Sequence, residues 1–107
     1  MSDKLLVITT VPNQKAAEDL AAGLVRDGVA ACVNISAPVT SMYQWKGQLE
    51  RDTEVMLTIK TTGSRYPQLE RAILDGHPYE LPEVIAVPIT QGLPEYLAWI
   101  EACTNNS

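Results

Sequence analysis

The chain has 107 residues, of which 46% are hydrophobic and 20% are charged, a balance typical of one soluble globular domain. Its formal net charge of −5, with eight scattered Lys and Arg residues, argues against nucleic-acid binding, which needs a concentrated basic face. No apolar run approaches the roughly 20 residues of a membrane-spanning helix, and no signal peptide is recognised, so we expect no membrane contact.

The two cysteines, Cys32 and Cys103, indicate a reducing compartment. They form no CxxC pair and no disulfide framework, which makes the cytoplasm the expected location. Because Cys32 lies in the apolar run "VAACVNI", it is predicted to be a buried core residue.

The first third of the chain predicts a β-α-β unit. Residues 4–11 form an apolar, β-branched run of strand length. Asn13 is a suitable cap for a helix over 14–28, and Gly28 is a suitable end for it. The apolar residues 29–35 then predict a second strand.

A long hairpin follows. Residues 38–45 and 48–61 are strand-like and are joined at Lys46-Gly47. In the second stretch apolar residues alternate with polar ones, which is typical of a sheet with two different faces. A strand of about 13 residues spans roughly 43 Å. A domain of this size is only about 34 Å across, so we expect the hairpin to overhang its domain, bend over it or carry a bulge.

The hairpin tip carries more apolar bulk than a solvated tip normally holds. The side chains concerned are Met42, Tyr43, Trp45 and Leu49. Two explanations remain open, namely burial under the last helix of the same chain and burial against another subunit. We favour the second, with Met42, Tyr43 and Trp45 as interface residues.

The second half of the chain predicts a helix, a strand and a further helix. Residues 64–76 form the first helix, with Ser64 as its cap. Residues 84–90 form a strand in which Pro88 indicates an edge or a bulge. A short helix follows at 94–102.

This order predicts an α+β fold, the ferredoxin-like β-α-β-β-α-β sandwich with a long central hairpin and an added C-terminal helix. We expect a single domain over 1–107 with a frayed tail at 104–107. Since this fold hosts many functions, function must be argued from a site.

The segment "HPYELPE" contains the only histidine, His77. Its two prolines make the preceding residues extended, so one interpretation is a rigid connector. The other is that the same stiffness holds His77, Tyr79, Glu80 and Glu83 at a cleft between subunits, with Lys60 nearby. Such a cleft would suit a metal ion or a small polar ligand.

The chain shows no catalytic pattern, because no nucleophile is tied to a base by sequence, and no enzyme is predicted. Trp99 is interpreted as a packing residue. Four hairpin residues are interpreted as a solvated charged face, although salt bridges to a partner strand would also use them: Glu50, Arg51, Asp52 and Glu54.

Taken together, "YQWKGQLE", "LTIKTT", "HPYELPE" and "YLAWI" resemble the CutA divalent-cation-tolerance family, from Leu5 to Cys103. The resemblance implies a cytoplasmic homotrimer arranged like the PII signalling proteins, with hairpins reaching across to neighbouring subunits. It also implies copper ligands, namely a cysteine at the end of the first strand and two adjacent histidines. Here Thr9 and Gly76 replace two of these, so only His77 remains and copper binding is expected to be weak.

The leading hypothesis is therefore a non-enzymatic, homotrimeric protein of the divalent-cation-tolerance type. It would respond to metal ions, by binding copper or a small ligand at clefts between subunits. The alternative is a trimeric structural or signalling adaptor that acts through a protein partner, with metal binding incidental.

Overall fold

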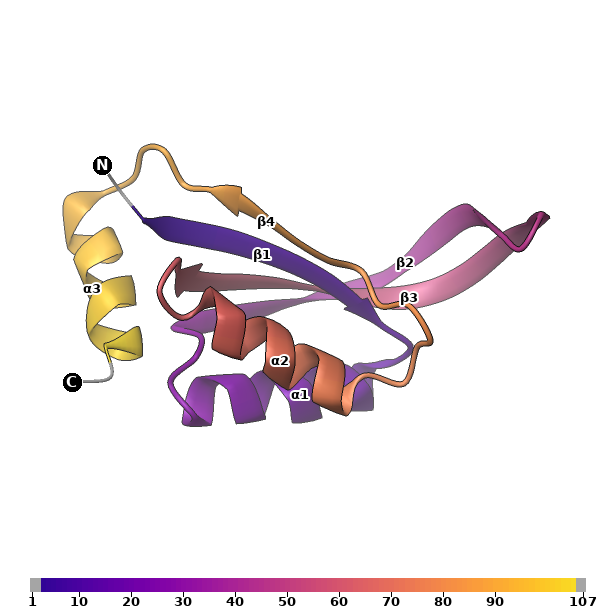
Figure 1. Ribbon diagram of the computed structural model, residues 1–107, viewed down its shortest axis with the longest axis horizontal. Helices are drawn as coiled ribbons and strands as arrows, with labels where there is room; N and C mark the ends of the chain where they lie inside the picture. The colour runs from indigo at the N-terminus through magenta and orange to yellow at the C-terminus, as the bar shows by residue number, and fades with distance from the viewer. Residues whose placement is uncertain (1–2, 106–107) are drawn as a thin grey trace.

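The computed structural model describes residues 3–105. Its elements are β1 (Lys4–Val11), α1 (Gln14–Arg26), β2 (Cys32–Trp45), β3 (Gln48–Thr62), α2 (Tyr66–Gly76), β4 (Val84–Pro88) and α3 (Pro94–Thr104). The strands form one antiparallel sheet in the order β2-β3-β1-β4. Helices α1 and α2 lie together on one side of the sheet, and α3 lies at one end (Figure 1). The predicted ferredoxin-like α+β class is confirmed.

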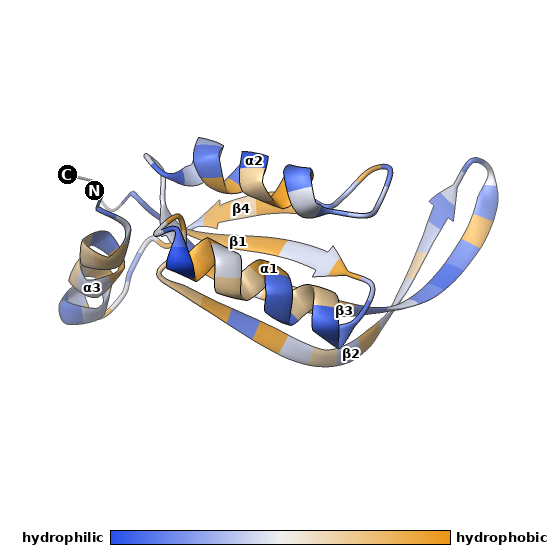
Figure 2. Ribbon diagram, turned by 90° about the horizontal axis from the view of Figure 1, so that it is seen from below, coloured by the Kyte–Doolittle hydropathy of each residue, from blue (hydrophilic) through white to orange (hydrophobic). Residues whose placement is uncertain are grey.

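The hydrophobic core lies between the sheet and the helices α1 and α2. Val7 on β1 pairs with Ile59 on β3, and both are fully buried. Leu69 and Ile73 project from α2 into the same cluster. Since each fully buried residue of this kind contributes about 1.5–3 kcal/mol, this layer supplies most of the apolar burial. Figure 2 is seen from the side of α1 and α2, and Figure 1 shows that the opposite face of the sheet has no covering helix along most of its length.

Helix α1 begins and ends as the sequence predicts. The Asn13 Oδ1 accepts the backbone N–H of Ala16 at 2.8 Å, and Gly28 has the positive φ of 71° that suits glycine. The prediction that Ser64 caps α2 is wrong. Arg65 occupies the cap position without a side-chain cap, and the Ser64 hydroxyl hydrogen-bonds to the Thr62 hydroxyl instead.

Strand β2 merges two segments that the sequence separates. The predicted strands at 29–35 and 38–45 form one strand that begins only at Cys32 and has a bulge between Ile35 and Pro38. Pro38 has no N–H to donate to the ladder, which favours a bulge at this point. At the bulge the Ser36 hydroxyl accepts the backbone N–H of Met56 at 2.9 Å, in place of a backbone hydrogen bond between the strands.

The hairpin of β2 and β3 overhangs the domain, as its length predicts (Figure 1). The molecule measures 44 × 25 × 24 Å, and its radius of gyration of 14.4 Å exceeds the roughly 13 Å of an ordinary domain of this size. Lys46 and Gly47 form the turn, with φ of 53° and 80°. Positive φ at both positions is the pattern of a type I′ turn, whose twist matches that of the strands.

The tip of the hairpin is exposed within a single chain. Met42 is 60% exposed and Leu49 is 69% exposed. Helix α3 lies at the opposite end of the molecule (Figure 1). Burial of the tip under the last helix, one of the two explanations considered, is therefore wrong.

Helix α3 is anchored at its C-terminal end. The Arg65 Nε donates to the carbonyl oxygen of Thr104 at 2.7 Å, which places a cation at the negative end of the helix. Ile100 is fully buried and Thr104 is 2% exposed. A frayed tail that starts at Thr104 is therefore wrong, and residues 106–107 of the predicted tail lie outside the described residues.

The sheet edge and the cysteines complete the picture. Strand β4 is an edge strand, so Pro88 lies where the sequence predicts.

Cys32 is only partly buried, so the prediction that it is a core residue is wrong. It alternates with Val33 along β2 and points to the open face. Cys103 is exposed. Within residues 3–105, no helix has the length and apolar content to cross a membrane.

Candidate functional site

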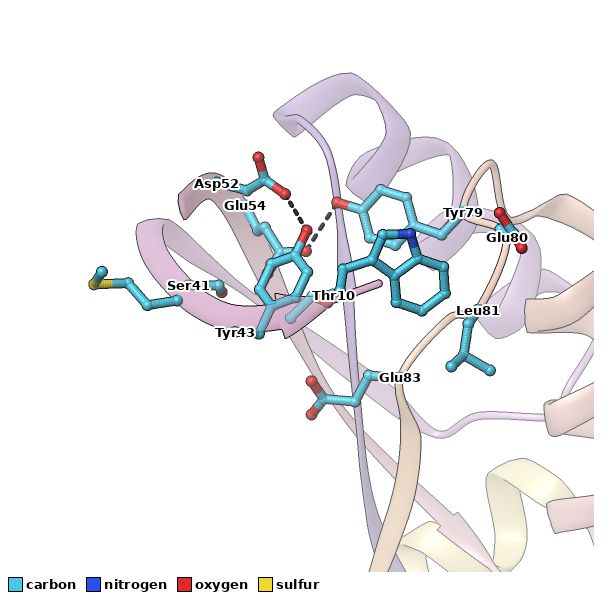
Figure 3. A pocket seen from close by; sticks show the side chains of 11 residues that line it. Thr10, Ser41, Tyr43, Asp52, Glu54, Tyr79, Glu80, Leu81 and Glu83 are labelled. Carbon is cyan, nitrogen blue, oxygen red and sulfur yellow. Dashed lines mark hydrogen bonds between the residues drawn. The ribbon is translucent and has the colours of Figure 1, made fainter. Parts of the chain in front are cut away.

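A cavity of about 540 Å³ lies between the outer half of the hairpin and the segment that follows α2. Its walls combine aromatic rings with carboxylates (Figure 3). It is lined by Thr10, Ser41, Met42, Tyr43, Trp45, Asp52, Glu54, Tyr79, Glu80, Leu81 and Glu83. The volume lies in the range of small-molecule sites.

His77 fixes the segment at 77–83 against β1. Its Nε2 donates to the carbonyl oxygen of Thr10 at 2.7 Å, and its Nδ1 accepts the N–H of Tyr79 at 3.2 Å. These partners assign the neutral ring with its proton on Nε2. The ψ of 133° at His77 is the extended conformation that Pro78 imposes on its predecessor. This geometry supports the connector interpretation of the segment.

The Tyr79 side chain lines the cavity. Its hydroxyl donates to the Glu54 Oε1 at 2.9 Å (Figure 3). Burial and then the hydrogen bond to Glu54 raise the pKa of Tyr79 well above its ordinary value. Tyr79 therefore stays neutral and keeps its proton on the side of the carboxylate. Glu54 is 8% exposed, which is unusual for an acidic residue.

Tyr43 and Asp52 form a second pair of the same kind. The Tyr43 hydroxyl donates to the Asp52 carboxylate, and this hydrogen bond is the main reason that the pKa of Tyr43 is raised to about 12. Figure 3 shows both tyrosine hydroxyls pointing toward the two neighbouring carboxylates of β3. The pairs give the cavity two oriented rings and two oriented negative charges.

The ammonium group of Lys46 lies at the rim of the cavity. The Lys46 Nζ lies 5.6 Å from the centroid of the Trp45 ring and 3.9 Å from the Glu80 Oε1. Both side chains of this ion pair are largely exposed, at 69% and 72%, so the pair itself adds little stability. The pair matters for its geometry, because it places the Lys46 ammonium group near the Trp45 ring of the cavity.

The structure brings together most of the residues that the sequence selected. Tyr79, Glu80 and Glu83 line the cavity, and they are joined by the predicted interface residues, Met42, Tyr43 and Trp45. Lys60 is not among them. Its Nζ donates to the Asn34 Oδ1 on the open face, six residues or roughly 20 Å along β3 from Glu54.

The sequence did not predict that Asp52 and Glu54 of β3 line the cavity. Asp52 and Glu54 were interpreted as part of a solvated face, and this is wrong for Glu54 because Tyr79 covers it. The available signal was their spacing. Residues two apart on a strand point to the same side, so both had to face one surface.

The described residues do not fit a copper site. Both ring nitrogens of His77 are engaged in hydrogen bonds within the chain. Thr9 is fully buried, and its hydroxyl has no hydrogen-bond partner in the described structure. Across residues 3–105, no three His, Cys, Asp or Glu side chains are grouped as metal ligands. The prediction that His77 binds a metal ion stays a prediction, and a lone, engaged imidazole is a weak ligand.

The fold, a ferredoxin-like sandwich with an overhanging hairpin, is PII-like. The sequence of residues 5–103 matches the family model of the CutA1 divalent ion tolerance protein. The chain therefore belongs to the CutA1 family.

Relatives and solved structures agree with this assignment. The chain is 52% identical over 91 residues to the CutA homolog of Xenopus laevis, and the match covers 85% of this chain and 60% of that one. It is 41% identical over 99 residues to the CutA divalent-cation tolerance protein of Thermus thermophilus, covering 92% and 96%. The crystal structure of CutA from Xylella fastidiosa superposes with a TM-score of 0.95 at 38% identity, covering 97% and 100%.

The chain thus spans less than two thirds of the frog relative's length but almost all of the Thermus protein.

Proposed function

We propose that this chain works as a homotrimer of the divalent-cation-tolerance type, without catalytic activity, and that it binds its ligand at clefts between subunits. The single observation that carries this proposal is the overhanging hairpin with an exposed apolar tip. A monomer would leave Met42 and Leu49 in water at 60% and 69% exposure.

The rest of the open surface offers the tip a place to bind. Ile85 and Val87 are exposed, and their register with Ile8 and Leu6 puts them on the helix-free face of the sheet. Strand β4 is also an edge with unpaired backbone groups on its outer side. A neighbour's hairpin laid along this edge would extend the sheet, and a closed ring would leave no tip uncovered.

Assembly also bears on the ligand cleft. Lys60 lies on the open face that a neighbouring subunit would cover, so its place in a cleft with Tyr79, Glu80 and Glu83 requires the assembled trimer. Copper binding through His77 remains part of the proposal only as a weak interaction.

The alternative is a trimeric adaptor that acts through a protein partner, and a calorimetric titration with divalent metals distinguishes the two functions. Saturable, stoichiometric heat supports a role in the response to metal ions. Its absence from an intact trimer favours the adaptor.

A cytoplasmic location is also proposed, since neither Cys32 nor Cys103 is in a disulfide. Relatives vary in this respect, because the CutA protein of Arabidopsis thaliana is named as chloroplastic and that of Archaeoglobus fulgidus as periplasmic.

A matched pair of variants tests the assembly. Leu49→Lys places a charge on the tip, whereas Leu74→Lys places one on an exposed position of α2, away from the open face. Burying a leucine contributes about 1.5–3 kcal/mol, and a trimer repeats the contact in each subunit. We expect light scattering to show dissociation for Leu49→Lys and an intact trimer for Leu74→Lys. Equal masses for the two variants would contradict a role for the tip.

A further inference from the structure

We propose that the cavity between the hairpin and the 77–83 segment binds a small organic cation, an alkylammonium group, with Glu54 and Asp52 as counter-charges and Tyr43, Trp45 and Tyr79 as its walls. This inference rests on the proposed function, because the 77–83 segment that lines this cavity within one chain also borders the proposed cleft between subunits.

The charge of the cavity points to a cation. Glu54 is 8% exposed and lines the cavity, and its partner, the Tyr79 hydroxyl, is neutral. The ion pairs of the described residues involve neither Glu54 nor Asp52. Burying a carboxylate without a compensating cation is costly. A cationic ligand would supply the missing charge.

The geometry favours an organic cation over a metal ion. Divalent ions such as calcium or magnesium need several oxygen ligands at about 2.0–2.6 Å, and residues 3–105 contain no group of three or more His, Cys, Asp or Glu side chains that could hold one. The carboxylates of Asp52 and Glu54 each accept a hydrogen bond from a tyrosine hydroxyl instead. A cavity of about 540 Å³ is also far larger than a bare ion requires.

The aromatic walls favour an ammonium group. Rings attract a cation within about 6 Å of their centroids, and Lys46 already lies 5.6 Å from the Trp45 ring. Because the Lys46 side chain is exposed, it is a weakly held internal competitor rather than a permanent occupant. Leu81 lines the cavity and is 71% exposed. It offers an apolar contact to an alkyl chain attached to the cation.

The test uses two small probes of matched shape. The full-length protein is titrated with n-butylammonium chloride and with 1-butanol, and binding is followed by calorimetry and by tryptophan fluorescence. We expect saturable binding of n-butylammonium and none of 1-butanol. Equal binding of both probes, or no saturable binding of n-butylammonium to an intact trimer, would overturn the inference.

Variants locate the binding. Because hydrogen bonds to charged groups are among the strongest, we expect Glu54→Gln to weaken n-butylammonium binding by at least about tenfold. The exposed Asp52→Asn, which carries less folding risk, should also weaken it. Glu18→Gln removes an equal charge from the exposed surface of α1 and should change nothing. Unchanged affinity in both Asp52→Asn and Glu54→Gln would refute the assignment.

Lys46→Asn gives a prediction in the opposite direction. It removes the internal competitor while keeping a residue that tolerates the positive φ of this turn. We expect n-butylammonium to bind a few-fold more tightly, and weaker binding would contradict the competitor role. Light scattering on the same samples separates the two proposals. An intact trimer without binding defeats only the ligand assignment, whereas a monomer that binds defeats only the assembly.

Discussion

Replacing Thr9 by valine should stabilise the protein. Thr9 is fully buried at the centre of the sheet, and its hydroxyl has no hydrogen-bond partner within residues 3–105. An unpaired buried hydroxyl costs about 1–3 kcal/mol in protein mutational data. Valine has the same shape and is equally suited to a strand, so the change removes this cost without opening a cavity. We expect the free energy of unfolding to rise by about 1–2 kcal/mol.

Thr61→Val is the matched control. Thr61 is also fully buried, on the same face of the neighbouring strand, but its Oγ1 donates to the carbonyl oxygen of Val29 at 2.7 Å. Losing this bond should lower the free energy of unfolding by about 1 kcal/mol.

Urea unfolding at one fixed protein concentration measures both variants. A destabilised Thr9→Val protein, or shifts of the same sign in both, would refute the argument from hydrogen-bond satisfaction.

Three further results are expected. A thiol reagent should label the exposed Cys103 before the partly buried Cys32, and equal fast labelling would contradict the packing of β2. Copper(II) should bind weakly, and His77→Ala should abolish most of that binding, whereas unchanged affinity would place the copper elsewhere. The hydrogen bond of Tyr43 to Asp52 should stabilise the fold below pH 10 and lose this effect as the pH rises through about 12, and Tyr43→Phe should remove that dependence.

The fold could be predicted largely from local patterns. Alternation along β3 and the Asn13 and Gly28 helix ends depend on neighbouring residues only, and each was found where expected. The overhang followed from strand length alone. The bulge in β2 also has a local cause, because Pro38 lacks a backbone N–H. The hydrogen bond at the bulge, however, joins Ser36 to Met56, which lies 20 residues away.

The cavity was harder to predict because its contacts are distant in sequence. Glu54 is buried by Tyr79, which lies 25 residues further along the chain. His77 was selected for its chemistry, yet its ring is engaged by the backbone of Thr10, 67 residues earlier. Neither partner is visible in the local pattern, so the buried carboxylate of Glu54 was interpreted as solvated, and the hydrogen bonds that engage the His77 ring were not predicted.

Assembly is the central claim, and the mass of the unmodified chain in solution tests it most directly. Sedimentation equilibrium should be measured over a dilution series that reaches micromolar concentration. The account predicts a single species of three times the 11.7 kDa chain mass throughout. A stable, well-folded monomer would contradict it, because the exposed hairpin tip would then need no partner.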